Sequence, residues 1–315
     1  MYPVILASSL SLEASAYPKP GNVHRLSDLP DLRFEDFILT SSVASKWFTR
    51  GFRRGKRGWG RVVFGDLIYW IIRDTYVLTG GKNPCLGSSL LLTPLSVSIG
   101  KCVREGREEL ECFIEKVNEV LEATTVYDTI YFYRAVRIVK PSYIRKTDFT
   151  SEYVNIWSRK YVKELLEKNH RLIDVLRFSS KKDIIADELI NGYPRSRDAV
   201  GFLKKRLKKH NDWNRGIVET QIYLMSKYID TLVARKHGVE KAEYVRKLGE
   251  EHIMRIIEDQ GGEYSWLIEA HDLDKHLKKY RINPGSIADL VVTTIAFYLL
   301  EKYIEEKPLL LISQG

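Results

Sequence analysis

The segment YPKPGNVHR at residues 17–25 places three potential cations, Lys19, His24 and Arg25, in a single turn. Each proline fixes its own φ at about −65° and disfavours helix at the residue before it, whereas Gly21 can enter the left-handed region without steric cost. The turn is therefore rigid. Cations on a rigid turn are suited to bind a polyphosphate, although a surface loop that merely begins a helix would have the same sequence features.

Two later segments share this design, in which a turn rich in glycine and proline precedes an apolar helix. They are TGGKNPCLGSSLLLTPL at 79–95 and NPGSIADLVVTTIAF at 283–297. The first turn of a helix offers unpaired N–H groups and the positive end of the helix dipole, which together attract phosphate. Each segment is weak evidence by itself, because such turns are common. The candidate binding residues in the two segments are Gly81, Asn83, Gly87, Asn283 and Ser286.

Two aspartates lie in apolar helical segments. Asp289 falls in the first turn of the expected final helix, and Asp230 lies inside the stretch YIDTLVARKHG. In a purely structural role, Asp289 would balance the helix dipole and Asp230 would pair with Arg235 of its own helix. In a functional role, either could supply a catalytic carboxylate. The sequence leaves both alternatives open.

Residues 49–64, TRGFRRGKRGWGRVVF, alternate four glycines with six basic residues. Blocks of like charge are usually solvated, so a flexible surface loop is one interpretation. Glycines that bring backbone N–H groups close, beside arginines that bind phosphate oxygens in pairs, would instead make an anion clamp. A run of arginine and glycine with one tryptophan also resembles segments that bind RNA. We expect a flexible basic loop and leave its ligand open.

Helical periodicity runs through nearly every apolar segment, so the expected fold is all-α. Residues 126–139, VYDTIYFYRAVRIV, fit a strand pair by propensity and a helix by spacing, and we predict a helix. We expect a single large helical domain over residues 1–315, a multi-helix bundle with Gly/Pro loops at helix N-termini. The other predicted helices cover 34–48, 65–78, 106–123, 217–237, 239–259 and 286–305, with a break at Gly238.

The composition is that of a basic protein with a substantial core. The chain has 315 residues, of which 44% are hydrophobic and 29% charged. Its three cysteines lack metal-ligand spacing, which argues against a Cys-rich zinc site, and their odd number argues against a disulfide framework. Without a run of eighteen apolar residues or a basic leader, we predict a soluble, cytoplasmic protein with no membrane partner. The formal net charge of +9 favours an anionic partner.

Five segments, taken in order, resemble one known family. They are PKPGNVHR, GGKNPCLG, TTVYDTIYFYRAVRIVKP, DTLVARKHG and NPGSIADL, and the likeness to the triphosphoribosyl-dephospho-CoA synthases runs over residues 10–300. The resemblance implies an all-helical transferase that joins ATP to 3′-dephospho-CoA and expels adenine. In that family the product is the precursor of the prosthetic group carried by the acyl carrier proteins of citrate lyase and malonate decarboxylase. ATP and a dephospho-CoA-like acceptor are therefore the expected partners.

Two motifs depart from the family pattern. Bacterial members usually read GGVNTHKG where this chain reads GGKNPCLG, so Cys85 and Leu86 replace a histidine and a lysine. The aspartate that commonly follows the first motif is here His24. In both motifs, this chain resembles the branch of the family found mainly in archaea. The resemblance therefore carries the fold and the nucleotide chemistry, and it leaves the acceptor open.

The reaction that the resemblance implies gives roles to the candidate residues. Cleavage of the N-glycosidic bond of ATP passes through an oxocarbenium-like state, which needs a carboxylate, a proton donor for adenine and a base for the attacking hydroxyl. We expect Asp289, His24 and Asp230 to be catalytic, and Mg²⁺ to accompany the triphosphate, held by Asp289 and Glu13. The expected substrate-binding residues are Lys19, Arg25, Gly81, Asn83, Gly87, Asn283 and Ser286.

Two alternatives belong to other functional classes. A basic protein that binds a nucleotide or nucleic acid without catalysis would explain the net charge, but it would leave the three glycine-bearing junctions without a role. A family member that has lost its activity would bind a nucleotide only. The sequence gives no indication of the oligomeric state.

Overall fold

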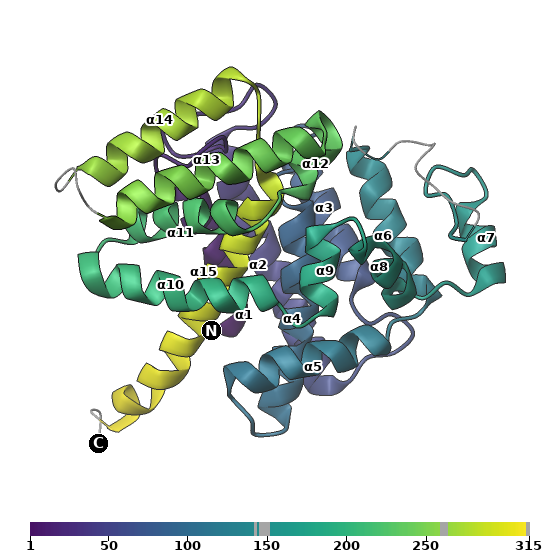
Figure 1. Ribbon diagram of the computed structural model, residues 1–315. Helices are drawn as coiled ribbons and strands as arrows, with labels where there is room; N and C mark the ends of the chain where they lie inside the picture. The colour runs from purple at the N-terminus through teal and green to yellow at the C-terminus, as the bar shows by residue number, and fades with distance from the viewer. Residues whose placement is uncertain (142–143, 145–151, 259–263, 313–315) are drawn as a thin grey trace. The chain divides into compact units, whose positions relative to one another are not determined.

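The part of the chain that the structure describes is helical throughout. The computed structural model describes residues 1–141, 144, 152–258 and 264–312 and places side chains up to residue 307. These residues form fifteen α-helices and no strand, with two isolated β-bridges in the loop after the first helix. The all-α prediction is confirmed. The helices, labelled in Figure 1, are α1 (Tyr2–Ser15), α2 (Phe34–Arg57), α3 (Gly65–Leu78), α4 (Leu86–Arg104), α5 (Leu110–Glu122), α6 (Val126–Val139), α7 (Tyr161–Lys168), α8 (Leu172–Ser180), α9 (Ile184–Ile190), α10 (Pro194–His210), α11 (Trp213–Lys227), α12 (Thr231–His237), α13 (Val239–Glu258), α14 (Ser265–Lys279) and α15 (Gly285–Ile312).

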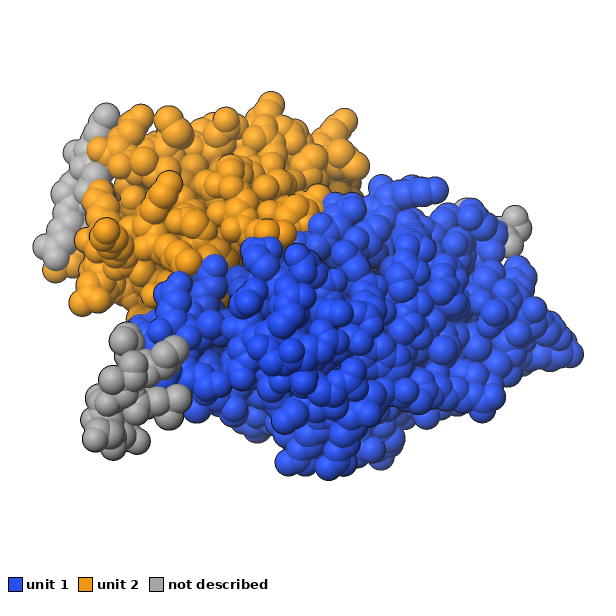
Figure 2. Space-filling view, turned by 90° about the horizontal axis from the view of Figure 1, so that it is seen from below, with its two compact units in different colours: residues 1–7, 39–193, 299–315 blue, residues 8–38, 194–298 orange. Residues whose placement is uncertain are grey.

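The helices fall into two compact units, which Figure 2 colours separately. Unit 1 contains residues 1–7, 39–193 and 299–315, and unit 2 contains residues 8–38 and 194–298. Helices α1, α2 and α15 each contribute residues to both units. Each unit is thus assembled from segments that lie far apart in the sequence. The expected single domain over the whole chain stays a prediction.

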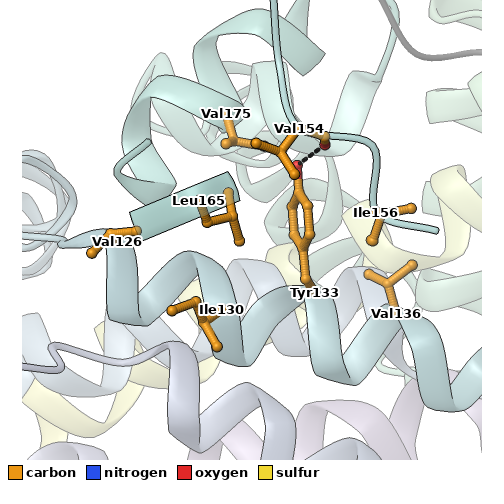
Figure 3. Close-up of a cluster of buried hydrophobic side chains, with 8 residues drawn as sticks. All are labelled: Val126, Ile130, Tyr133, Val136, Val154, Ile156, Leu165 and Val175. Atoms are coloured by element: carbon orange, nitrogen blue, oxygen red, sulfur yellow. Dashed lines mark hydrogen bonds between the residues drawn. The ribbon is translucent and has the colours of Figure 1, made fainter. Parts of the chain in front are cut away.

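In unit 1, α6 is the helix predicted over residues 126–139. It begins with a capping box, in which the Thr125 hydroxyl accepts the Tyr127 N–H and the Asp128 carboxylate accepts the Thr125 N–H. Figure 3 shows its apolar face within a buried cluster, where the Tyr133 hydroxyl donates to the Val154 carbonyl oxygen over 2.9 Å. The helical prediction for this segment is confirmed because its apolar residues recur at helical spacing on a buried face.

In unit 2, α11 packs against α10, α13 and α14, and α12 packs against α13. The single helix predicted over 217–237 is wrong, because the chain leaves the helix after α11 and starts again at α12. The cause is Asp230, whose side chain accepts the Val233 N–H and caps a new helix instead of lying inside an old one. The predicted break at Gly238 is confirmed, since this residue ends α12 with a φ of +92°.

The expected loop at 49–64 is helical over its first part, because α2 continues to Arg57. Gly51 and Gly55 lie four residues apart on one face of α2, and a side chain at either position would overlap α4, at Ser96 and Val97 respectively. These glycines therefore allow two helices to pack closely. From the sequence, they had the appearance of loop glycines.

One basic residue of the segment has a structural partner. Arg54 donates to both carboxylate oxygens of Asp66, over 2.6 and 2.8 Å, and to the Val63 carbonyl oxygen over 2.9 Å. It thereby ties α2 to the non-helical remainder of the segment, which leads into α3.

The cysteines and α4 qualify two expectations from composition. Cys102 and Cys112 form a disulfide between α4 and α5, which was not predicted from the odd number of cysteines, and Cys85 is buried outside this disulfide. Helix α4 is long and apolar enough to cross a membrane, but 78% of that window is buried inside the structure, as in a core helix of a soluble protein. The cytoplasmic location stays a prediction.

Candidate active site

The opening loop and the turn before α15 are in direct contact in unit 2. Gly21 has a φ of +72°, and a Cβ placed there would lie 2.6 Å from the carbonyl oxygen of Ile282 and 2.9 Å from Cδ of Pro284. Only glycine accommodates both the backbone conformation and the close approach. The first and third junctions identified in the sequence are thus parts of one structure.

A chain of amide side chains joins these two turns to α11. Gln221 Nε2 donates to the Pro20 carbonyl oxygen (3.0 Å) and to Asn22 Oδ1 (2.6 Å), and Asn22 Nδ2 donates to Asn283 Oδ1 (2.5 Å). Gln221 is fully buried, and its Oε1 accepts no hydrogen bond from the described residues. These hydrogen bonds place Asn283, a predicted binding residue, beside the opening loop.

Lys19 and Glu13, two predicted site residues, form a buried ion pair. The Lys19 ammonium donates to the Glu13 carboxylate and, over 3.1 Å, to the Glu13 carbonyl oxygen. Both side chains are at most 2% exposed. Burial lowers the pKa of Lys19 and raises the pKa of Glu13, while the attraction between them opposes both changes. The pair thus holds the opening loop against the end of α1.

His24 belongs to a second buried cluster, which it forms with Asp274 and Lys278 of α14. Its Nε2 lies 3.2 Å from the Asp274 carboxylate and 3.0 Å from Lys278 Nζ, which donates to the same carboxylate oxygen over 3.1 Å. The other oxygen of Asp274 accepts the Gly21 N–H over 2.9 Å. Burial lowers the pKa of His24 and of Lys278, and the neighbouring Asp274 opposes both shifts.

The backbone determines where a neutral His24 carries its proton. The Leu26 N–H donates to Nδ1 over 3.3 Å, so the proton of the neutral ring is on Nε2, which faces Asp274. Lys278 has 18% of its side chain exposed and is the most accessible member of the cluster. Because burial lowers the pKa of both bases, each gives up a proton more readily than it would in water, and the cluster is suited to proton exchange.

Arg25 is the exposed cation of the opening loop. Its guanidinium carbon lies 5.9 Å from the centre of the Tyr17 ring, and Asn214 fixes the Tyr17 backbone through two hydrogen bonds of 2.8 and 2.6 Å. Within the described part of the chain, Arg25 forms no ion pair. Of the three cations predicted for this turn, one is therefore open to solvent and two are buried.

Asp230 and Ser286 join the N-termini of α12 and α15. The Asp230 carboxylate accepts the Val233 N–H (2.8 Å) and the Ile287 N–H (2.9 Å), and Ser286 Oγ accepts the Leu232 N–H (3.2 Å). Burial raises the pKa of Asp230 to about 6, although the backbone donors favour its charged form. A further motif, DTLVARKHG, is thus joined to NPGSIADL by a carboxylate that caps two helices at once.

Asp289 lies on α15, one turn after Ser286, and is half-buried. Its backbone carbonyl accepts the Thr293 hydroxyl over 3.1 Å. Among the described residues, no group of three or more His, Cys, Asp or Glu side chains could hold a metal ion. A metal bound at Asp289 would therefore take other ligands from water or a substrate.

The second junction, with Gly81, Asn83 and Gly87, belongs to unit 1. Gly81 has a φ of +101°, and Asn83 Oδ1 accepts the Cys85 N–H over 3.4 Å. Gly87 lies in the first turn of α4, where the Cys85 side chain makes no capping hydrogen bond. The role of these residues in nucleotide binding stays a prediction.

Sequence reasoning missed Gln221, Asp274 and Lys278. Asp274 and Lys278 contact the predicted residue His24, and Gln221 contacts Asn22 of the same loop. Asp274 and Lys278 had a visible signal, an acid and a base four residues apart in the polar stretch HDLDKHLKK. That spacing is common on solvated helix faces and does not reveal that an incoming loop covers it.

Asp128, in the third motif, was also missed, and its surroundings indicate a structural role. It is fully buried in unit 1, and one carboxylate oxygen accepts the N–H groups of Val63, Phe64 and Gly65 over 2.8–3.0 Å. The other oxygen accepts the Thr125 N–H over 2.9 Å. Burial raises the pKa of Asp128, whereas the four N–H donors lower it. The motif thus fixes the start of α3 against the start of α6.

A comparison with known families agrees with the arrangement of these motifs. A family model described as CitG, ATP:dephospho-CoA triphosphoribosyl transferase, matches residues 4–308. The chain belongs to this family. No curated protein matches it. A crystal structure from Archaeoglobus fulgidus, described as a candidate triphosphoribosyl-dephospho-CoA synthase, has 23% sequence identity and a TM-score of 0.61, and the match covers 84% of this chain and 98% of that one.

Membership of the CitG family confirms the family resemblance and the enzyme class that were predicted from the sequence. The five motifs named in the sequence all fall within the matched residues. The A. fulgidus structure adds support for the fold alone, because its identity to this chain is low. A nucleic-acid-binding protein without catalysis is not favoured.

Proposed function

We propose that this protein transfers the triphosphoribosyl group of ATP to dephospho-CoA and releases adenine. The observation that carries the proposal is the meeting, in unit 2, of the first and last family motifs, whose Asn22 and Asn283 are 261 residues apart and share a hydrogen bond. The match to the CitG family over residues 4–308 supplies the reaction. Buried groups that can exchange a proton lie at the same junction.

The reaction exchanges one bond and one proton. The bond between C1′ of the ATP ribose and N9 of adenine breaks, and its electron pair leaves with adenine. A hydroxyl of dephospho-CoA forms the new bond to C1′ and gives up its proton, and adenine gains one. The enzyme therefore needs a group that accepts a proton on one side and returns it on the other, beside a carboxylate that stabilises the positive charge on the ribose.

The cluster of His24, Asp274 and Lys278 suits the proton transfer. Asp274 orients the imidazole and stabilises it when it is protonated, as a carboxylate does for a catalytic histidine. Lys278 contacts both partners and is the more accessible base. We assign the acceptance of the hydroxyl proton to this cluster, with His24 and Lys278 as the titrating groups.

Asp289 is the proposed carboxylate near the ribose and the triphosphate. ATP enters such sites as its Mg²⁺ complex, in which the metal binds phosphate oxygens and one or two protein carboxylates. Asp289 fits this role because it is half-buried near the N-terminus of α15, in the same motif as Asn283. Glu13 does not fit it, because Lys19 already neutralises its buried carboxylate. The exposed Arg25 is the proposed phosphate contact of the opening loop.

The proposal is tested by incubating the purified chain with ATP, Mg²⁺ and dephospho-CoA. Liquid chromatography should show adenine in amounts equal to the product, and mass spectrometry should show a mass equal to dephospho-CoA plus ATP minus adenine. Binding of ATP without adenine release, with every CoA-type acceptor tested, would contradict the proposal and leave a nucleotide-binding protein.

A further inference from the structure

Helix α2 places four cations on one face in unit 1. Lys46, Arg50, Arg53 and Arg57 follow one another at intervals of four, three and four residues, which is the spacing of one helix face. All four are exposed. Since each residue of a helix rises about 1.5 Å, this basic stripe is about 16 Å long. The opposite face carries the glycines that contact α4.

Two cavities lie along this stripe. One has a volume of about 500 Å³, and its walls include Lys46, Trp47 and Arg50. The other has a volume of about 530 Å³, with Met1, Pro3, Val4 and Phe52 in its wall. Thr49, Arg53 and Arg57 border both cavities. We refer to the two cavities together as the α2 trough.

Three of the four cations of the stripe have no anionic partner in the described part of the chain, and the fourth, Lys46, lies 3.7 Å from the Asp74 carboxylate. Arg50, Arg53 and Arg57 form no ion pair there, whereas their neighbour Arg54 binds Asp66 through both of its terminal nitrogens. Guanidinium groups collected on one face repel one another, and a bound anion removes that cost. The shared border at Arg53 and Arg57 is therefore suited to bind phosphate.

The two cavities differ in chemistry. The first is lined by cations and one indole ring, and the second adds a wall of apolar side chains, of which Met1 and Val4 are largely exposed. A ligand that fills both would carry a nucleoside at one end, phosphates in the middle and an uncharged, flexible chain at the other end. A nucleic-acid strand or ATP alone would leave the apolar wall unused.

We propose that the α2 trough binds the dephospho-CoA acceptor, with its diphosphate at Arg53 and Arg57 and its uncharged arm against Pro3, Val4 and Phe52. This inference rests on the proposed function, because it takes the acceptor from the family reaction. It adds the place where that acceptor binds, which no sequence motif of the family indicated.

The test measures binding to the full chain by calorimetry in the absence of ATP, so that it does not depend on turnover. The probes are dephospho-CoA, ADP and pantetheine. The double variant R53Q/R57Q should bind both dephospho-CoA and ADP at least about tenfold more weakly, the usual effect of losing charge-assisted hydrogen bonds. The control K205Q/K208Q removes two exposed charges from α10 in unit 2 and should bind as the wild type does.

A second variant separates the arm from the diphosphate. Val4 is 50% exposed, so V4Q should fold normally. It should weaken dephospho-CoA binding about threefold to tenfold, by the loss of apolar contact, and leave ADP binding unchanged. Circular dichroism confirms that each variant is folded.

The outcomes distinguish this inference from the proposed function. Dephospho-CoA affinity equal in the wild type and in folded R53Q/R57Q overturns the trough, even when the wild type releases adenine from ATP. An equal loss of affinity in the α10 control also overturns it, because the effect would then be one of net charge. A loss of dephospho-CoA affinity that is confined to the trough variants supports the site, even if no adenine is released and the proposed function fails.

Discussion

At the scale of single residues, the opening loop owes its chemistry to groups supplied from elsewhere. His24 was predicted as a catalytic residue from its place in the loop, and within the loop its Nδ1 accepts the Leu26 N–H. Asp274 of α14 supplies a carboxylate at Nε2, and burial lowers the pKa of the imidazole. The position where relatives commonly carry an aspartate thus holds a histidine here, with a carboxylate beside it.

Substitution of His24 tests the proton-transfer cluster. His24→Gln keeps a hydrogen-bonding side chain of similar size but cannot accept a proton, and we expect kcat to fall by about 10²–10⁴. In the wild type, activity should decline on the acid side as His24 becomes protonated. Because burial lowers the pKa of His24, this decline should lie below about pH 6.5, its ordinary value. The measurement is adenine release against pH, and an unchanged acid limb in the variant would exclude His24.

Asp289 is tested by a change that keeps shape and removes charge. If it stabilises the ribose cation or contacts Mg²⁺, Asp289→Asn should lower turnover by about two orders of magnitude, or about 2.7 kcal/mol in the barrier, with little change in Tm. A role limited to the helix dipole would cost about 0.3–1 kcal/mol of stability and leave turnover intact. Adenine release and thermal unfolding of the same preparation separate the two roles.

Asp230 predicts a dependence of stability on pH. Burial raises its pKa from 3.8 in the unfolded chain to about 6 in the folded one, so the folded state binds the proton more tightly. The contribution of Asp230 to the unfolding free energy is complete below pH 4 and falls by about 1.4 kcal/mol per pH unit between pH 4 and 6. It is lost above pH 6, a total loss of about 3 kcal/mol. The difference in unfolding free energy between the wild type and Asp230→Asn, measured in urea across this range, should show that slope. If the difference in unfolding free energy does not change with pH, the N–H donors of α12 and α15 cancel the effect of burial on the pKa of Asp230.

At the scale of elements, α2 shows how one residue type can predict the wrong structure. Glycine is frequent in loops, but at Gly51 and Gly55 it serves a contact between helices, and a helix can hold two glycines when the packing energy exceeds their entropic cost. The local composition of 49–64 contained no information about α4, so the length of α2 could not be read from it.

Alanine substitutions at two helical glycines test this explanation. Gly55→Ala should destabilise the fold by about 1–3 kcal/mol, because the new methyl group would overlap the Val97 carbonyl oxygen. Gly201→Ala is the matched control on α10, where a Cβ would meet nothing within 4 Å. It should stabilise the fold by about 0.5–1 kcal/mol. Chemical denaturation of both variants gives the comparison, and an opposite order of stabilities would refute the packing role of Gly55.

The sequence predicted helix positions better than it predicted partners. Periodicity placed α6 and the break at Gly238, because both depend on local spacing and on single residues. It failed at Asp230, where a cap that also binds the Ile287 N–H divides what looked like one helix. The same limit applies to the site. Lys19 and His24 could be named from the loop, whereas Asp274 and Gln221 gain their meaning only when distant segments meet.

At the scale of the whole molecule, substrate binding should raise the stability of the fold. A ligand that binds only the folded state at one hundred times its Kd adds about 2.7 kcal/mol to the unfolding free energy. We expect ATP to raise Tm when Mg²⁺ is present and to have a much smaller effect with EDTA, because the metal carries part of the charge of the triphosphate. Thermal unfolding with ATP, with and without EDTA, is the measurement. An identical shift in both conditions would remove Mg²⁺ from the proposed site.

The opening loop and the α14 residues that it contacts lie far apart in the sequence, and this distance sets an order of events during synthesis. The Gly21 N–H and the Asp274 carboxylate that accepts it are 253 residues apart. At about 5–20 residues per second, a ribosome that has made Gly21 needs about 10–50 s more to reach Asp274. Lys19 can meet Glu13 early, but His24 has no carboxylate to orient it until α14 has left the ribosome. The nascent enzyme therefore gains its proton-transfer cluster among the last steps of its own synthesis, and a chain that terminates before α14 cannot assemble it.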